Sequence, residues 1–164
     1  MICDKLVIRD CINSDQKSIR KIIKSSFGRE AEANFVAINT SNTGQTISLI
    51  AECDGQAVGH ILMAEIDAPC KAMAIAPLAV IPKYREMQVG SQLIRQALRI
   101  AKEKDMAAIF ASGDPLYYER FGFSIENAKK FNGSASIANK GPKNSRLIAL
   151  DLKPEVFKCA KLAK

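Results

Sequence analysis

The sequence contains a single histidine, His60, and no Gly-x-Ser-x-Gly segment. Hydrolases of the Ser-His-Asp type need a histidine beside an activated serine, so little is present from which to build such a triad. Walker and Gly-x-Gly-x-x-Gly sequences are also absent, which disfavours a P-loop kinase or a dinucleotide-dependent dehydrogenase. No run of 18 apolar residues occurs, and the first residues are not a basic segment followed by an apolar one. We therefore expect no membrane span and no secretory signal.

Cysteine is sparse and irregularly placed. The five cysteines never form a C-x-x-C pair and are odd in number; they are Cys3, Cys11, Cys53, Cys70 and Cys159. This distribution predicts reduced, mostly buried thiols of a cytoplasmic protein rather than a disulfide framework or a zinc site. We expect no metal.

The length and charge of the chain set further bounds. A chain of 164 residues fits one domain, residues 1–164, with a real core, and 48% apolar and 25% charged residues are typical of globular proteins. The net charge of +7 falls in the last third, where nine basic and two acidic residues follow from Lys129 onward. That segment is either a solvated tail or faces nucleic acid, an acidic substrate or the phosphates of a nucleotide cofactor. No aromatic-interleaved basic platform accompanies it, which disfavours nucleic acid.

Hydrophobic periodicity and turn residues predict an α/β domain of the α+β type. Asp54-Gly55 between two apolar runs predicts a hairpin, and a strand–helix–strand crossover over 71–111 implies a parallel strand pair. The expected strands are 6–9, 46–53, 56–66, 71–81, 107–111, one starting at 123, and 146–152; the expected helices are 14–27, 30–38, 89–104 and one starting at 115.

The rest of the chain is organised around residues 73–98. An apolar run up to Ile81 predicts a buried strand, and apolar residues from Leu93 at i, i+3 and i+4 spacing predict a helix with one buried face. The turn between them contains Gly90. Free N–H groups at a helix start, with the helix dipole behind them, form an anion site, to which Arg85 can add a bidentate charge.

The order Val80-x-Pro82-x-x-Arg85-x-x-Gln88-x-Gly90 resembles motif A of the GCN5-related N-acetyltransferases, whose loop holds the pyrophosphate of acetyl-CoA. Gln88 stands where that motif has its first glycine. If the position requires φ > 0, glutamine there is strained.

A second segment supports the same resemblance. Residues 113–123, GDPLYYERFGF, are similar to the end of motif B, and together with residues 76–85 they resemble the YhbS-like branch of predicted acetyltransferases. The resemblance implies the GNAT fold: a mixed central sheet of six to seven strands with a splayed motif A strand, flanked by about four helices.

The resemblance also implies the cofactor and its contacts. Acetyl-CoA would be the acyl donor, with its pantetheine and thioester paired to peptide groups of Leu78, Ala79 and Val80. Pro77 has no N–H, which fits a strand that is not fully paired. Arg85 and the N–H groups of Met87, Gln88, Val89, Gly90 and Ser91 would take the pyrophosphate.

Direct transfer to an amine needs an acid for the leaving thiolate and a base for the amine. Tyr118 matches the family's acid position, and the neighbouring Tyr117 is the alternative. Asp114 is expected to cap a short helix, and Phe121 and Phe123 are expected to be core aromatics.

The base stays open between Glu65, Glu32 and water, and His60 is expected at a polar rim. The implied acceptor is a primary amine on a small molecule or a peptide, and a homodimer is one of the open oligomeric states. Two other functions remain: a non-catalytic acyl-CoA-binding regulatory module, or a nucleic-acid-associated protein using the basic third.

Overall fold

The computed structural model describes the chain except residues 1–2, 32, 34–43, 69, 131–145 and 154–164. Most of the expected helix 30–38, the candidate base Glu32, Cys159 and most of the basic last third therefore lie outside the described residues. None of the described helices is long and apolar enough to cross a membrane.

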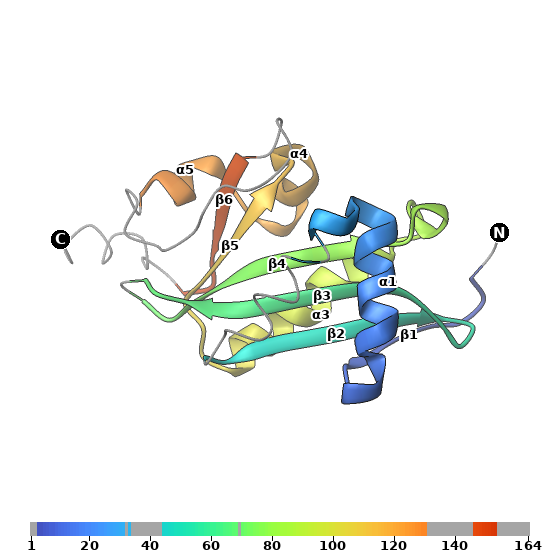
Figure 1. Cartoon of the computed structure of the whole chain (residues 1–164). Helices are drawn as coiled ribbons and strands as arrows, with labels where there is room; N and C mark the ends of the chain where they lie inside the picture. The colour runs from blue at the N-terminus through green and yellow to red at the C-terminus, as the bar shows by residue number, and fades with distance from the viewer. Residues whose placement is uncertain (1–2, 32, 34–43, 69, 131–145, 154–164) are drawn as a thin grey trace. The chain divides into compact units, whose positions relative to one another are not determined.

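Six strands and several helices follow one another along the chain (Figure 1). The strands are β1 (Leu6–Asp10), β2 (Thr46–Cys53), β3 (Gln56–Ile66), β4 (Ala72–Val80), β5 (Ala108–Gly113) and β6 (Arg146–Asp151). The α-helices are α1 (Gln16–Phe27), α3 (Val89–Glu103), α4 (Pro115–Tyr118) and α5 (Ile125–Lys129), with 3₁₀ turns at Asn13–Asp15, Pro82–Tyr84 and Glu119–Phe121.

The strands are hydrogen-bonded in sequence order, β1-β2-β3-β4-β5-β6. Pairing is antiparallel between β1 and β2 and between β5 and β6, and parallel between β4 and β5. The sheet is therefore mixed, and the predicted crossover is confirmed. The chain divides into two compact units: Met1–Met63 with Ala76–Ile100, and Ala64–Ile75 with Ala101–Lys164.

In the first unit, two helices cover opposite faces of the strands (Figure 1). The apolar stripe of α1 is fully buried against Ile50, Leu62 and Ala79; it consists of Ile19, Ile22 and Ile23. On the other face, α3 approaches β3 at Gly59. A Cβ at Gly59 would lie 2.9 Å from Cγ1 of Val89 and 3.1 Å from Cδ1 of Leu93, so only glycine admits the helix at this distance.

The second unit has its own core around Phe110, which is fully buried. Its buried partners are Ala72, Ala107, Ala108, Ala128 and Ala149. Small side chains on β4, β5 and β6 leave room for one large aromatic ring, and α5 contributes Ala128 to this cluster.

The expected strand starting at residue 123 is wrong. Ser124 makes only an isolated bridge to Ala149, and the chain then forms α5. The Ser124 hydroxyl accepts a hydrogen bond from the N–H of Asn127 at 3.1 Å, and Glu126 stands in the first turn, so capping and the helix dipole favour a helix here.

The prediction that all cysteines are reduced is also wrong, because Cys3 and Cys53 form a disulfide with their Cα atoms 5.6 Å apart. Antiparallel pairing places Leu6 opposite Cys53, which brings the residues just before β1 to the end of β2. Asp54 completes the contact: its carboxylate accepts the N–H of Lys5 at 2.8 Å, and its own N–H donates to the Lys5 carbonyl at 2.9 Å. Cys11 and Cys70 are free thiols.

We predict that Cys3→Ser lowers the free energy of unfolding by about 2–4 kcal/mol, because a cross-link over a sequence separation of 50 residues restricts the unfolded chain. Denaturant unfolding measures this loss, and dithiothreitol should reproduce it in the wild type. Cys11→Ser is the matched control. If reductant destabilises the wild type and Cys3→Ser to the same extent, the disulfide does not contribute.

Candidate functional site

The loop between β4 and α3 is anchored on both sides. The Ile81 carbonyl accepts the N–H of Tyr84 at 2.8 Å, and the Tyr84 side chain is buried. Arg85 is exposed, and its guanidinium donates to the carbonyl of Ser26 at the end of α1, 3.4 Å away. The loop therefore rests on α1 while the arginine remains open to solvent.

Two residues of this loop adopt left-handed backbone conformations: Glu86 with φ 70° and Gln88 with φ 65°. The condition under which glutamine would be strained at position 88, a positive φ, is therefore met. A side chain in this region costs roughly 1–2 kcal/mol. Gly90, by contrast, lies within the first turn of α3 and has no positive φ.

The first turn of α3 can bind an anion. The backbone bond from the Gln92 N–H to the Gln88 carbonyl, at 3.0 Å, begins the helical ladder, and the preceding N–H groups of the first turn have no acceptor within the helix. The first turn contains no acidic residue that would offset the helix dipole. The side chains of Val89 and Ser91 are buried, so backbone groups rather than side chains are available to a ligand there.

The orientation of the β4 peptides distinguishes the three residues expected to contact the cofactor. The N–H of Ile81 donates to the Val58 carbonyl of β3 at 2.9 Å. Peptide directions alternate along a strand, so those of Ala79 also face β3, and those of Leu78 and Val80 face the other way. The Val80 carbonyl accepts the Ser26 hydroxyl at 2.9 Å. The parallel pairing of β4 with β5 covers Ala72–Ala74 and Ala108–Phe110, so Leu78 and Val80 lie outside the paired segment.

In the second unit, Asp114 starts α4 as predicted. Its carboxylate accepts the N–H of Leu116 at 3.0 Å, and Pro115 occupies the first turn. Tyr118 is buried and contacts the ring of Phe123 edge to face, with ring centres 5.4 Å apart. Phe123 is a core residue as expected, and Phe121 is half-buried.

Gly113 holds the Tyr118 ring in place, and sequence reasoning missed this role. A Cβ at Gly113 would lie 2.6 Å from Cε2 of Tyr118, so the ring occupies the space that any other residue would need. Burial raises the pKa of the Tyr118 phenol above its usual value, with a smaller contribution from Tyr117. The phenol is therefore protonated at neutral pH.

His60 does not lie at a polar rim, and that prediction is wrong. The ring is fully buried, with Nε2 3.1 Å from the Ser48 hydroxyl. Burial lowers the pKa of His60 to about 4, so the ring is neutral at physiological pH. A polar pair lies nearby: Arg9 donates two hydrogen bonds to Asp15 at 2.8 and 2.9 Å and lowers the pKa of that carboxyl to about 2. A buried neutral imidazole in such a network is a structural group.

Other candidate residues complete the description. Glu65 lies at the end of β3 and is half-buried. The one group of metal-type ligands that comes together in the described residues is Cys3, Cys53 and Asp54, and the disulfide uses both of its sulfurs. A thiolate site for a cation is thus not available in the oxidised protein.

A strand that runs through a left-handed loop into an open helix N-terminus, followed by a tyrosine-bearing helix after the crossover strand, is the order of elements expected of the GNAT acetyltransferase fold. Residues 16–123 match the sequence model of the Acetyltransferase (GNAT) family. The chain belongs to this family.

Individual relatives support the assignment. The N-acetyltransferase YjhQ of Escherichia coli K12 is 37% identical over 118 residues, which cover 67% of this chain and 65% of YjhQ. YhbS of the same organism is 33% identical over 124 residues, covering 73% of this chain and 74% of YhbS. The crystal structure of E. coli YhbS in complex with CoA superimposes with a TM-score of 0.77 at 28% identity, over 93% of this chain and 84% of that one. The resemblance to this branch is confirmed.

We predict that Gln88→Gly raises the free energy of unfolding by about 0.5–1 kcal/mol. Removing the Cβ relieves the strain of the left-handed conformation, but glycine also increases the conformational entropy of the unfolded chain, which offsets part of the gain. Gln88→Ala, which keeps the Cβ, should give no such gain. Denaturant unfolding of both variants checks this, and an equal shift in the two would contradict it.

Proposed function

We propose that the protein is an acetyl-CoA-dependent N-acetyltransferase that transfers the acetyl group to a primary amine by direct attack. The observation that carries the proposal is the first turn of α3, with its uncompensated N–H groups and the exposed Arg85 beside them. Two phosphates carry several oxygens that such donors and a guanidinium can bind together. Relatives named as N-acetyltransferases and a structural neighbour that holds CoA support this.

The roles of the residues follow from their geometry. The N–H groups of Met87 to Ser91 and the Arg85 guanidinium bind the pyrophosphate, and the outward peptide groups of Leu78 and Val80 pair with the pantetheine and polarise the thioester carbonyl. Ala79 faces β3 and supports the strand. The amine nitrogen bonds to the thioester carbon as the C–S bond breaks. One proton leaves the amine for the base, and CoA leaves as a thiolate that takes up a proton from solvent.

Tyr118 assists the leaving thiolate as a hydrogen-bond donor. A phenol has a reference pKa near 10 and a thiol one near 8.5, so full proton transfer from tyrosine to the thiolate is uphill by about 2 kcal/mol. Burial raises the pKa of Tyr118 further, which increases this cost. A neutral phenol that donates to developing negative charge on sulfur avoids it. The base that receives the amine proton is Glu65, Glu32 or water.

The acceptor is a small-molecule or peptide amine, the protein acts in the cytoplasm, and a homodimer is compatible with this chemistry.

A non-catalytic acyl-CoA-binding module is the second candidate, because Gln88 and Glu86 both strain the loop where glycine would relieve it. The two functions differ in turnover: the module would bind acetyl-CoA yet produce no CoA with any amine.

We predict that Arg85→Ala weakens acetyl-CoA binding roughly tenfold or more, through loss of a charged, bidentate phosphate contact. Isothermal titration calorimetry of the purified protein with acetyl-CoA measures this. Lys83→Ala is the matched control, because Lys83 is an exposed cation two residues away in the same loop. No acetyl-CoA binding at millimolar concentration in the wild type, or equal weakening in both variants, would refute the proposed phosphate site.

We predict that Tyr118→Phe lowers kcat roughly 10- to 100-fold with little change in KM for acetyl-CoA, because one hydrogen bond to a charged atom is lost. Gly113→Ala should lower kcat in the same direction by displacing the ring, whereas Tyr117→Phe should not. Since its pKa is raised, Tyr118 stays protonated up to about pH 10, so its ionisation should not reduce the rate below that pH. An unchanged kcat in Tyr118→Phe would exclude the donor role.

A further inference from the structure

The outer face of α1 carries an unusual concentration of positive charge. Lys17, Arg20, Lys21 and Lys24 follow one another at i, i+3, i+4 and i+7, and the helix contains no acidic residue. Like charges at these spacings repel one another and destabilise a helix. Packing does not require them, because the opposite stripe of α1 fills the core.

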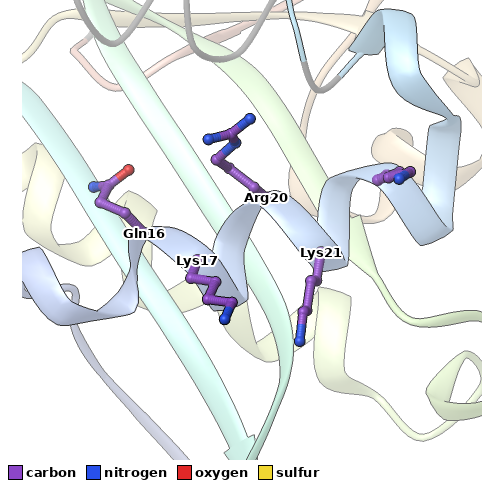
Figure 2. Close-up of a pocket in the computed structure, with 5 residues that line it drawn as sticks. Gln16, Lys17, Arg20 and Lys21 are labelled. Carbon is purple, nitrogen blue, oxygen red and sulfur yellow. The ribbon is translucent and has the colours of Figure 1, made fainter.

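These cations border a cavity of about 410 Å³, whose lining is completed by Gln16 (Figure 2). In Figure 2, Gln16 and Arg20 project to one side of α1, and Lys17 and Lys21 project to the other. The cavity is within the size range of small-ligand pockets. Among the described residues that line it there is no carboxylate and no aromatic ring.

The lysines of this face have no acidic neighbour in the part of the chain that the structure describes. Arg9 pairs with Asp15 and Glu52, and Lys153 pairs with Asp105, and none of these pairs involves a lysine of α1. Lys17, Lys21 and Lys24 are exposed. Their charge is therefore available to a ligand.

This face is separate from the phosphate loop. The inner stripe of α1 packs on Ala79 of β4, so the cations lie on the far side of a helix about 10 Å thick. A ligand there lies on the opposite side of α1 from the β4 peptides.

We infer that the outer face of α1 is a second anion site, which takes a small ligand carrying two or three linked phosphate groups and no aromatic base. Seven residues of helix span about 10 Å, which allows a short phosphate chain to meet several of the four cations, whereas an isolated anion would meet one or two. Phosphate oxygens suit the ammonium groups of Lys17, Lys21 and Lys24. The described lining offers a nucleoside no ring on which to stack.

Calorimetric titration with inorganic triphosphate, at constant ionic strength, tests this inference. Lys17→Gln/Lys21→Gln should weaken triphosphate binding roughly tenfold, as expected when two charged contacts are lost. Lys102→Gln/Lys104→Gln removes the same charge from exposed positions of the second unit and should change binding less than about twofold. Citrate, with three carboxylates, should bind more weakly than triphosphate.

Arg85→Ala separates this inference from the proposed function. Because the proposed phosphate loop can itself take triphosphate, Arg85→Ala removes that contribution, and the binding that depends on Lys17 and Lys21 should remain in this variant. Lys17→Gln/Lys21→Gln should leave acetyl-CoA binding unchanged. The inference is overturned if the α1 double variant binds triphosphate as the wild type does, if the control pair weakens binding equally, if citrate binds as tightly, or if Arg85→Ala abolishes the binding.

Discussion

The position of α3 depends on one close contact, the approach of its first two turns to Gly59 of β3. Because a Cβ at this point would come within 2.9 Å of Val89, any other residue would push the start of α3 away from the strands. The start of α3 is also where the free N–H groups are. A packing constraint in the middle of β3 therefore fixes the distance between β4 and the turn that we propose binds phosphate, and the loop has only residues 81–88 in which to connect the two.

That short connection explains the strained backbone. The chain must turn away from the strand direction and present successive N–H groups toward one point, and it does so with left-handed residues at Glu86 and Gln88. Glycine would adopt this geometry without strain, but it would also give the free loop more conformations. Contacts on either side hold the loop instead: buried Tyr84 before it and buried Val89 after it. Strain of this kind persists only where neighbouring packing fixes the backbone.

Much of the fold was predictable because the informative residues are local. Asp54-Gly55, the apolar period of α1 and α3, and the Asp114 cap each act within a few residues, and each prediction is confirmed. Two of the failures concern contacts distant in sequence. The Cys3–Cys53 disulfide follows from strand register. His60 is buried because its face of β3 lies under α1, and the polarity of a histidine side chain does not predict such burial. Ser124 was read as part of a strand although its hydroxyl caps a helix. Within the candidate site, the motifs identified Arg85 and Tyr118, but not Gly113, whose role depends on a ring five residues away.

Different sides of α1 contact the core of the first unit and the residues of the candidate site. Its apolar stripe packs on the strands, and its last turn supports the site: the Ser26 hydroxyl bonds to the Val80 carbonyl, and the Ser26 carbonyl accepts from Arg85. The Val80 carbonyl is thereby held by the protein, which leaves the N–H of the same residue, and both peptide groups of Leu78, as the β4 groups open to a pantetheine. Arg85 is held by a single neutral contact, so a phosphate, with full negative charge, can displace the Ser26 carbonyl from it. The arginine is thus positioned before any ligand binds, and no carboxylate of the described residues pairs with it, as the proposed phosphate contact requires.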